Sequence, residues 1–273
     1  ATVWRPLMAL SSCARSPWGA RITCFLLLFA FAWHGLAGLA FAEQRPLSSS
    51  ENERLVARRA LAIAYFQAQL LPHALTEVDL ALGVAPLDPD TLALKALILQ
   101  HQNRPQSAET LYLQAQALAP LSVSIAHNFG LFYCQFSRFD QAETQFKRAL
   151  THSEGFEHDK TAWARGLCLL QNDQFQAADG VLSAVLDRRP AFIFDSLKLV
   201  SLKMKLGSLE EAEKILNNFN DSPSVSAQSL GLSIVLAQRQ NQTDKKLHWG
   251  KLLGLHFSNS AQWRAYQEGT LHD

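Results

Sequence analysis

Small residues recur along this chain at an interval of 34 residues, and this spacing limits the possible folds more than any other feature. Three sets of positions show it: Ala62, Ala96 and Gly130; Ala74, Ala108 and Ala142; and Ala81, Ala115 and Ala149. The surrounding segments have the apolar periodicity of helices and lack the alternation typical of strands. A period of this length indicates repeated units that bury their apolar faces against their neighbours.

The pattern resembles the tetratricopeptide repeat, a helix hairpin of 34 residues with small residues where its helices cross. With Leu55 as the start of a unit, the large positions and the closing proline also match, as Leu61, Tyr65, Val78 and Pro86. A two-residue slip restores the register in a fourth unit, and two weaker units follow. The sequence therefore predicts an all-α fold, a right-handed solenoid of about six helix hairpins over residues 55–273.

Gly130 stands in the middle of an apolar helical run, where glycine costs about 1 kcal/mol relative to alanine. The repeat explains it, because Gly130 would let one helix backbone approach the other at their crossing. We expect Gly130→Leu to overpack this crossing by about 1–3 kcal/mol.

Residues 1–42 have the composition of a secretory signal peptide. They contain three arginines and no acidic residue, and an apolar run ends in Ala40-Phe41-Ala42. We expect cleavage before Glu43, followed by a flexible linker over residues 43–54; an uncleaved membrane anchor is the alternative. Cys24 stands at the beginning of the apolar run without a small-residue box, so no lipid attachment is expected there.

The formal charge of +1 excludes a strongly basic nucleic-acid-binding surface, and loss of the three arginines gives 1 − 3 = −2. No phosphate-binding loop, nucleophile elbow or paired catalytic carboxylates occur in the sequence. The histidines and acids of residues 152–159 match no metal-ligand spacing, and a solvated loop is expected there. We therefore expect no catalytic residue, metal, cofactor or small-molecule substrate.

The first helices of such units line a concave groove, and the corresponding positions here are mainly apolar. A groove of this kind suits an extended or helical segment of another protein. The alternative for any one of these side chains is packing between units, and Trp163 is the strongest contact candidate because it is large and flanked by polar residues. The candidate groove residues are Phe66, Leu97, His127, Leu131, Trp163, Leu167 and Phe194.

Cys134 and Cys168 are the cysteines that remain after removal of the signal segment. They fall on the first helices of adjacent units, where a disulfide would close a long loop and stabilise the fold by about 3–4 kcal/mol. Two separate buried thiols are the alternative. His127 lies two helical turns from Cys134, too far to activate it as a nucleophile.

The stretch "HNFGLFYCQFSRFDQAETQFKRAL" resembles the third-unit signature of the PilW/PilF family of type IV pilus biogenesis proteins, and "ARGLCLLQNDQFQAA" is similar to its next unit. The C-terminal "HFSNSAQWRAYQEG" resembles the family's tail. The resemblance implies six tetratricopeptide units and a disulfide between Cys134 and Cys168. His127 replaces the first asparagine of the family's motif, and Ser258 replaces its usual proline.

The resemblance also implies a non-enzymatic, pilotin-like adaptor that binds the outer-membrane secretin or another pilus-assembly component. We expect a periplasmic protein whose association with the outer membrane is indirect, since the lipid-attachment box of many members is missing. A general periplasmic scaffold for another cell-envelope complex is the alternative within the binding proteins. A thiol-active redox protein is the alternative from another class, and it would require a reactive cysteine.

Overall fold

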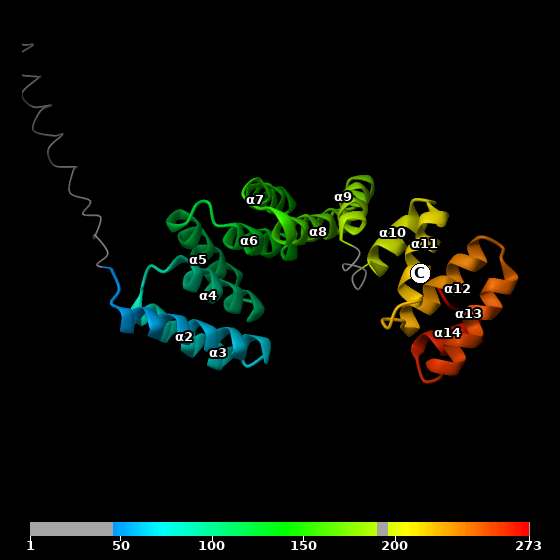
Figure 1. Ribbon diagram of the computed structural model, residues 1–273, viewed down its shortest axis with the longest axis horizontal. Coiled ribbons are helices and arrows are strands. Elements are labelled where there is room, and N and C mark those ends of the chain that lie inside the picture. The colour runs from blue at the N-terminus through cyan, green and yellow to red at the C-terminus, as the bar shows by residue number, and fades with distance from the viewer. Residues whose placement is uncertain (1–45, 190–195, 273) are drawn as a thin grey trace, which may run out of the picture. The chain divides into compact units, whose positions relative to one another are not determined.

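The computed structural model describes residues 46–189 and 196–272 (Figure 1). The predicted signal peptide over residues 1–42 and the candidate groove residue Phe194 lie outside the described residues. Among those residues the secondary structure is α-helical, and no strand occurs. The predicted all-α fold class is confirmed.

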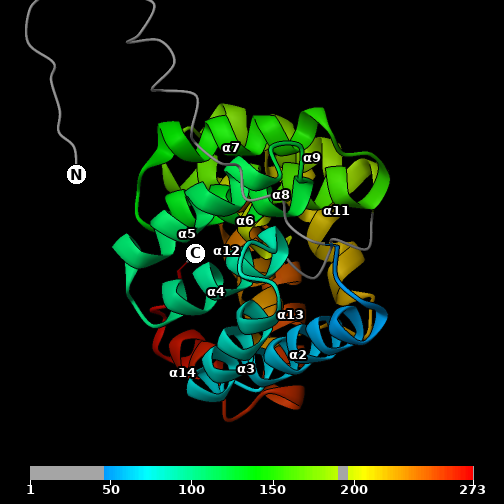
Figure 2. The same ribbon diagram turned by 90° about the vertical axis from the view of Figure 1, so that its left-hand side faces the viewer.

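Thirteen helices follow one another along the described chain. Their bounds are α2 Ser49–Gln67, α3 Leu71–Val84, α4 Pro89–His101, α5 Pro105–Leu118, α6 Val123–Gln135, α7 Phe139–Thr151, α8 Gly155–Gln171, α9 Phe175–Arg188, α10 Leu197–Lys205, α11 Leu209–Asn220, α12 Ala227–Arg239, α13 Thr243–His256 and α14 Ala261–Glu268. Consecutive helices from α2 to α13 form six hairpins, and α14 packs against α12 and α13 (Figure 1). Figure 2 views the stack from the end at which α2 and α3 lie. The predicted number of hairpins is confirmed, whereas the handedness of the superhelix stays a prediction.

The turn inside each hairpin repeats the same backbone geometry. One residue per turn has φ between 55° and 80°: Gln69, Asn103, Ser137, Asp173, Gly207 and Asn241. The next residue donates its N–H to a carbonyl five positions earlier, as Arg104 does to Leu99, which closes the preceding helix. The spacing is 34 residues except between Ser137 and Asp173, where 173 − 137 = 36. The two-residue slip therefore lies between the third and fourth hairpins.

The recurrent small residues lie where the two helices of a hairpin cross. Gly130 on α6 faces α7, where an added Cβ would lie 2.8 Å from two ring carbons of Phe146. Phe146 is fully buried, so its ring has no open space to move into. We expected a close approach of backbones here, but the space at Gly130 is taken by this ring. Gly166 on α8 has the same relation to Leu182 on α9.

Two connections differ from the sequence prediction. The expected linker over residues 43–54 is helical from Ser49 onward, and the Ser49 hydroxyl donates to Glu53 within this first turn. The expected solvated loop around residue 155 is the start of α8, and Asp159 is buried there. Asp159 accepts hydrogen bonds from Arg188 and Arg189 at the end of α9, and these charges compensate its burial.

Each hairpin is covered by the next one along the chain. The first helices of neighbouring hairpins contact each other from α2 through α8, and α10 contacts α12 in the same way. The apolar core accordingly continues from one unit to the next, as expected for a repeat fold. Within the described part of the chain, none of the helices has both the length and the apolar composition needed to cross a membrane.

Candidate functional site

An open groove of about 870 Å³ runs along the first helices of the second to fourth hairpins, and Lys198 of α10 in the fifth hairpin also lines it. Five of the seven candidate residues line it: Leu97 from α4, His127 and Leu131 from α6, and Trp163 and Leu167 from α8. Both cysteines line it as well. The structure therefore brings together most of the residues that the repeat pattern assigned to one groove, while their contact with a partner stays a prediction.

The lining side chains differ in depth. Leu131 is 38% exposed, and Leu97 and Leu167 are half-buried, so these leucines offer apolar surface to a partner. Trp163 is only 4% exposed and packs in the core cluster that contains Leu182. Most of the indole surface is therefore in contact with the protein itself, which makes Trp163 part of the groove floor.

His127 is also buried in the floor, where its Nδ1 lies 3.0 Å from Thr161 Oγ1 on α8. This burial lowers the pKa of His127 to about 4. Lys160 contributes to the lowering and Glu157 opposes it. The ring is accordingly neutral at pH 7 and presents the groove with a polar, uncharged group.

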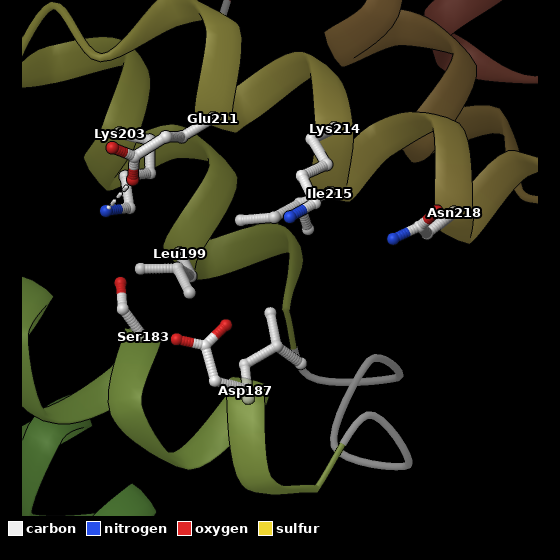
Figure 3. Close-up of a pocket in the computed structure, with 9 residues that line it drawn as sticks. Ser183, Asp187, Leu199, Lys203, Glu211, Lys214, Ile215 and Asn218 are labelled. Carbon is white, nitrogen blue, oxygen red and sulfur yellow. Dashed lines mark ion pairs between the residues drawn. The ribbon is translucent and has the colours of Figure 1, made fainter.

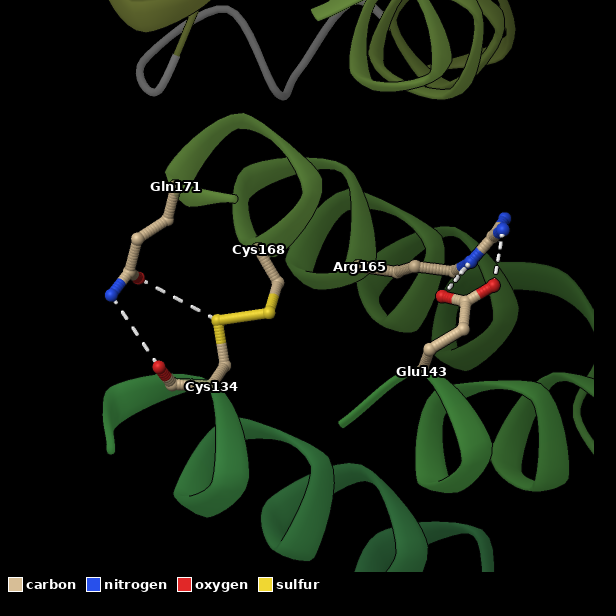
Figure 4. Close-up of a disulfide and its surroundings, with 5 residues drawn as sticks. All are labelled: Cys134, Glu143, Arg165, Cys168 and Gln171. Atoms are coloured by element: carbon tan, nitrogen blue, oxygen red, sulfur yellow. Dashed lines mark hydrogen bonds and ion pairs between the residues drawn. A yellow bond between two sulfur atoms is a disulfide. The ribbon is translucent and has the colours of Figure 1, made fainter. Parts of the chain in front are cut away.

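A disulfide joins Cys134 of α6 to Cys168 of α8, with 5.8 Å between the two Cα atoms (Figure 4). The predicted disulfide is confirmed, and the alternative of two separate thiols is not observed. Both cysteines are buried, at 7% exposure. The Gln171 amide donates to the Cys134 carbonyl at 3.4 Å, which adds a second link between the same two helices.

An ion pair fixes α8 against the second helix of the preceding hairpin. Arg165 donates to both carboxylate oxygens of Glu143 on α7, at 2.7 Å each (Figure 4). The bond from Arg165 lowers the pKa of the Glu143 carboxyl, against the effect of burial. With the disulfide, α8 is thus held to both helices of the third hairpin, and the groove between α6 and α8 is preformed.

Amide side chains form a polar edge beside the apolar floor. Gln100 donates to Gln135 Oε1 at 2.6 Å and accepts from the Tyr112 hydroxyl at 3.2 Å. Gln135 and Gln171 are exposed and line the groove. Amides offer both donors and acceptors, which is the complement of an unpaired peptide backbone.

Phe66 does not line this groove. Its ring packs edge-on against His101, with 4.8 Å between the ring centroids, and it is a partly buried residue packed against the core cluster of the first two hairpins. The sequence pattern made Phe66 a groove candidate from its repeat position alone. In the structure its ring contacts His101 of α4.

Several lining residues were absent from the sequence prediction. They are His101, Lys160 and Lys198, together with Gln135 and Gln171 of the polar edge. The exposed side chains of Lys160 and Lys198 come from α8 and α10 and bring positive charge to the groove. Their side chains are long, so the repeat position of the Cα atom does not reveal where the charge lies.

A second hollow of about 500 Å³ lies among α9, α10 and α11 (Figure 3). Its buried Lys203 forms ion pairs with Asp179, at 2.7 Å, and with Glu211. Burial alone would lower the pKa of Lys203, but these two carboxylates raise it above its usual value. The lysine is therefore satisfied within the protein. Within the part of the chain that the structure describes, no group of His, Cys, Asp or Glu side chains is arranged to hold a metal ion.

No protein-family model and no curated protein matches the chain. Among solved structures, PilF of Pseudomonas aeruginosa is similar, with a TM-score of 0.69 and 22% identity over 81% of this chain and 100% of that chain. PilW, described as a widely conserved type IV pilus biogenesis factor, has the same TM-score and identity over 81% of this chain and 99% of that chain. YrrB, a tetratricopeptide repeat protein with an unusual peptide-binding site, has a TM-score of 0.57 and 15% identity, over 70% and 97% of the two chains. The chain therefore has the tetratricopeptide-repeat fold, and PilF and PilW share this fold over nearly their whole lengths.

Proposed function

We propose that this protein is a non-enzymatic adaptor of type IV pilus assembly, which binds a protein partner in the groove between α4 and α8. The single observation that carries the binding role is the convergence of Leu97, Leu131 and Leu167 from three hairpins on one open, preformed groove. Apolar surface presented in this way suits an extended or helical segment.

The pilus assignment depends on the likeness to PilW, which is described as a type IV pilus biogenesis factor. Of the pilus components, the outer-membrane secretin is our first candidate partner, with help in its assembly or in pilus stability as the role. The Cys134–Cys168 disulfide supports an exported protein in the periplasm, because disulfides persist in oxidising compartments.

Two measurements test this proposal. Deletion of the gene should reduce both the SDS-resistant secretin multimers and the surface pili, and the gene supplied on a plasmid should restore both. The purified protein without residues 1–42 should retain the secretin from a membrane extract. Normal multimers and normal pili in the deletion strain would contradict the pilus role.

The alternative is a general periplasmic scaffold for another cell-envelope complex. It predicts that the deletion strain keeps its pili and that the purified protein retains an envelope component unrelated to the pilus. A thiol-active redox role would require a reactive cysteine. The only two cysteines among the described residues are bonded to each other, which favours binding over redox chemistry.

A further inference from the structure

The charged side chains that line the groove are of one sign. Lys160 and Lys198 line it, and no carboxylate does so among the described residues. Lys160 has an exposed ion pair with Glu157 at 3.4 Å, and no ion pair is present at Lys198 in the described part of the chain. An exposed ion pair between residues one helical turn apart is weak, so the ammonium group of Lys160 is available to a partner, as is that of Lys198.

The groove thus has an apolar floor, an amide edge and a cationic side. Leucines at different depths accept apolar side chains, and the exposed amides of Gln135 and Gln171 complement a peptide backbone. Two lysines against one exposed carboxylate, Glu157, leave net positive charge at the groove, which attracts an acidic segment and repels a basic one. These three properties describe an extended peptide that combines apolar and acidic side chains.

We infer that the groove binds an internal, extended segment of the partner in which acidic side chains, facing Lys160 and Lys198, accompany apolar ones. The two lysines come from helices of different hairpins, α8 and α10. This arrangement suits separate side-chain carboxylates along a segment, rather than a single carboxylate at a chain end. The inference depends on the proposed binding function and specifies the chemistry of its partner.

Peptide pools test this chemistry without knowledge of the partner. Three amidated, acetylated pools contain Leu, Ile, Val and Phe in random order at alternating positions, with Asp, Asn or Lys as the only residue that differs between pools. A fourth pool has Asn and a free C-terminal carboxylate. Each pool is passed over the immobilised protein without residues 1–42, and the retained peptide is quantified by mass spectrometry.

We expect about ten-fold more retention of the Asp pool than of the Lys pool at low salt, from a few favourable and unfavourable charge pairs. Raised salt should reduce this preference, because the two lysines are exposed. The double variant Lys160→Gln/Lys198→Gln should abolish it. The matched control Lys147→Gln/Lys251→Gln removes two exposed lysines that do not line the groove, and it should keep the preference.

With the three amidated pools, any of three results would overturn the inference: equal retention of the Asp and Lys pools, retention of none of the pools, or an unchanged preference in the groove variant. Equal retention of the free-carboxylate pool and the Asp pool would also overturn it, because the groove would then recognise a chain end. A deletion strain with defective pili and secretin, combined with no preference for acidic peptides, would leave the pilus role standing and reject only this inference. A clear acidic preference in a protein whose deletion leaves pili intact would support this inference and reject only the pilus role.

Discussion

His127 Nδ1 on α6 lies 3.0 Å from Thr161 Oγ1 on α8, and this contact is buried beneath the groove. The two residues belong to neighbouring hairpins, so the contact links one repeat to the next. It also places an imidazole where protonation is costly, since burial lowers the pKa of His127 to about 4.

The first prediction concerns the pH dependence of stability. An unfolded histidine titrates near 6.5, so below this pH the unfolded chain takes up a proton that the folded protein does not. The free energy of unfolding should therefore be highest above pH 6.5 and fall as the pH decreases towards 4, by about 2 kcal/mol at pH 5 from His127 alone. Urea denaturation at pH 7 and pH 5 measures the difference. His127→Gln, which cannot titrate, should lose most of this dependence; an equally steep dependence in the variant would assign it to another group.

The second prediction concerns Gly130. Even alanine at this position should destabilise, because its Cβ would lie 2.8 Å from the buried Phe146 ring. We expect Gly130→Ala to lower the free energy of unfolding by about 1–3 kcal/mol despite the better helix propensity of alanine. Gly180→Ala on α9 is the matched control, because a Cβ there meets nothing within 4 Å, and it should stabilise by up to about 1 kcal/mol.

The Gly130 explanation has its own internal test. If the Phe146 ring is the obstacle, Phe146→Leu should reduce the cost of Gly130→Ala. The double variant should then lose less free energy of unfolding than the two single variants lose together. Additive effects in urea denaturation would show that the cost arises elsewhere.

The third prediction concerns the disulfide. Cys134 and Cys168 are 34 residues apart, and closing a loop of this size stabilises by about 3–4 kcal/mol in the chain-entropy estimate. Cys134→Ser/Cys168→Ser should be less stable by this amount and keep its helical circular dichroism at 20 °C. Dithiothreitol should lower the denaturation midpoint of the wild type to that of the variant and leave the variant unchanged. An equal response of the two proteins would contradict a stabilising bridge.

The sequence predicted the hairpins because the repeat is a packing rule as well as a pattern. Ala62 and Ala96 are buried in core clusters that include residues of the second helix of the same hairpin, and Gly130 is buried against Phe146 of its second helix, so a larger side chain has little room at these positions. The groove could be located for the same reason, since position within a repeat determines which face of the stack a residue lies on. The repeat position does not determine how deep a side chain lies or which neighbour it contacts. The depth of Trp163 depends on packing from the next hairpins, and the contact of Phe66 depends on a histidine from α4.

The connections were predicted less well than the helices. Asp159 reads as part of a polar loop in the sequence, because the partners that allow its burial, Arg188 and Arg189, come 29 and 30 residues later. The charges of the groove were missed in a similar way. Lys198 follows a segment that the structure does not describe, and its place beside residues of α6 and α8 depends on the fold.

The depth of the groove residues also determines which of them can test partner binding. Trp163→Ala removes a buried indole, and large-to-small changes of this kind cost about 3–5 kcal/mol. Weaker partner capture by that variant could therefore result from a lost contact or from a destabilised fold, and the experiment would not separate the two. A groove residue with an exposed apolar side chain avoids this problem.

The fourth prediction uses Leu131 for this purpose, since its side chain is 38% exposed and lines the groove. Leu131→Gln should change the free energy of unfolding by no more than about 0.5 kcal/mol. It should weaken retention of the secretin from a membrane extract at least five-fold, about 1 kcal/mol, if the leucine is a central contact. Leu121→Gln is the matched control: Leu121 is 67% exposed in the connection before α6 and does not line the groove, so retention should stay at the wild-type level. Equal loss of retention in both variants, or no loss in Leu131→Gln, would place the partner on another surface of the protein.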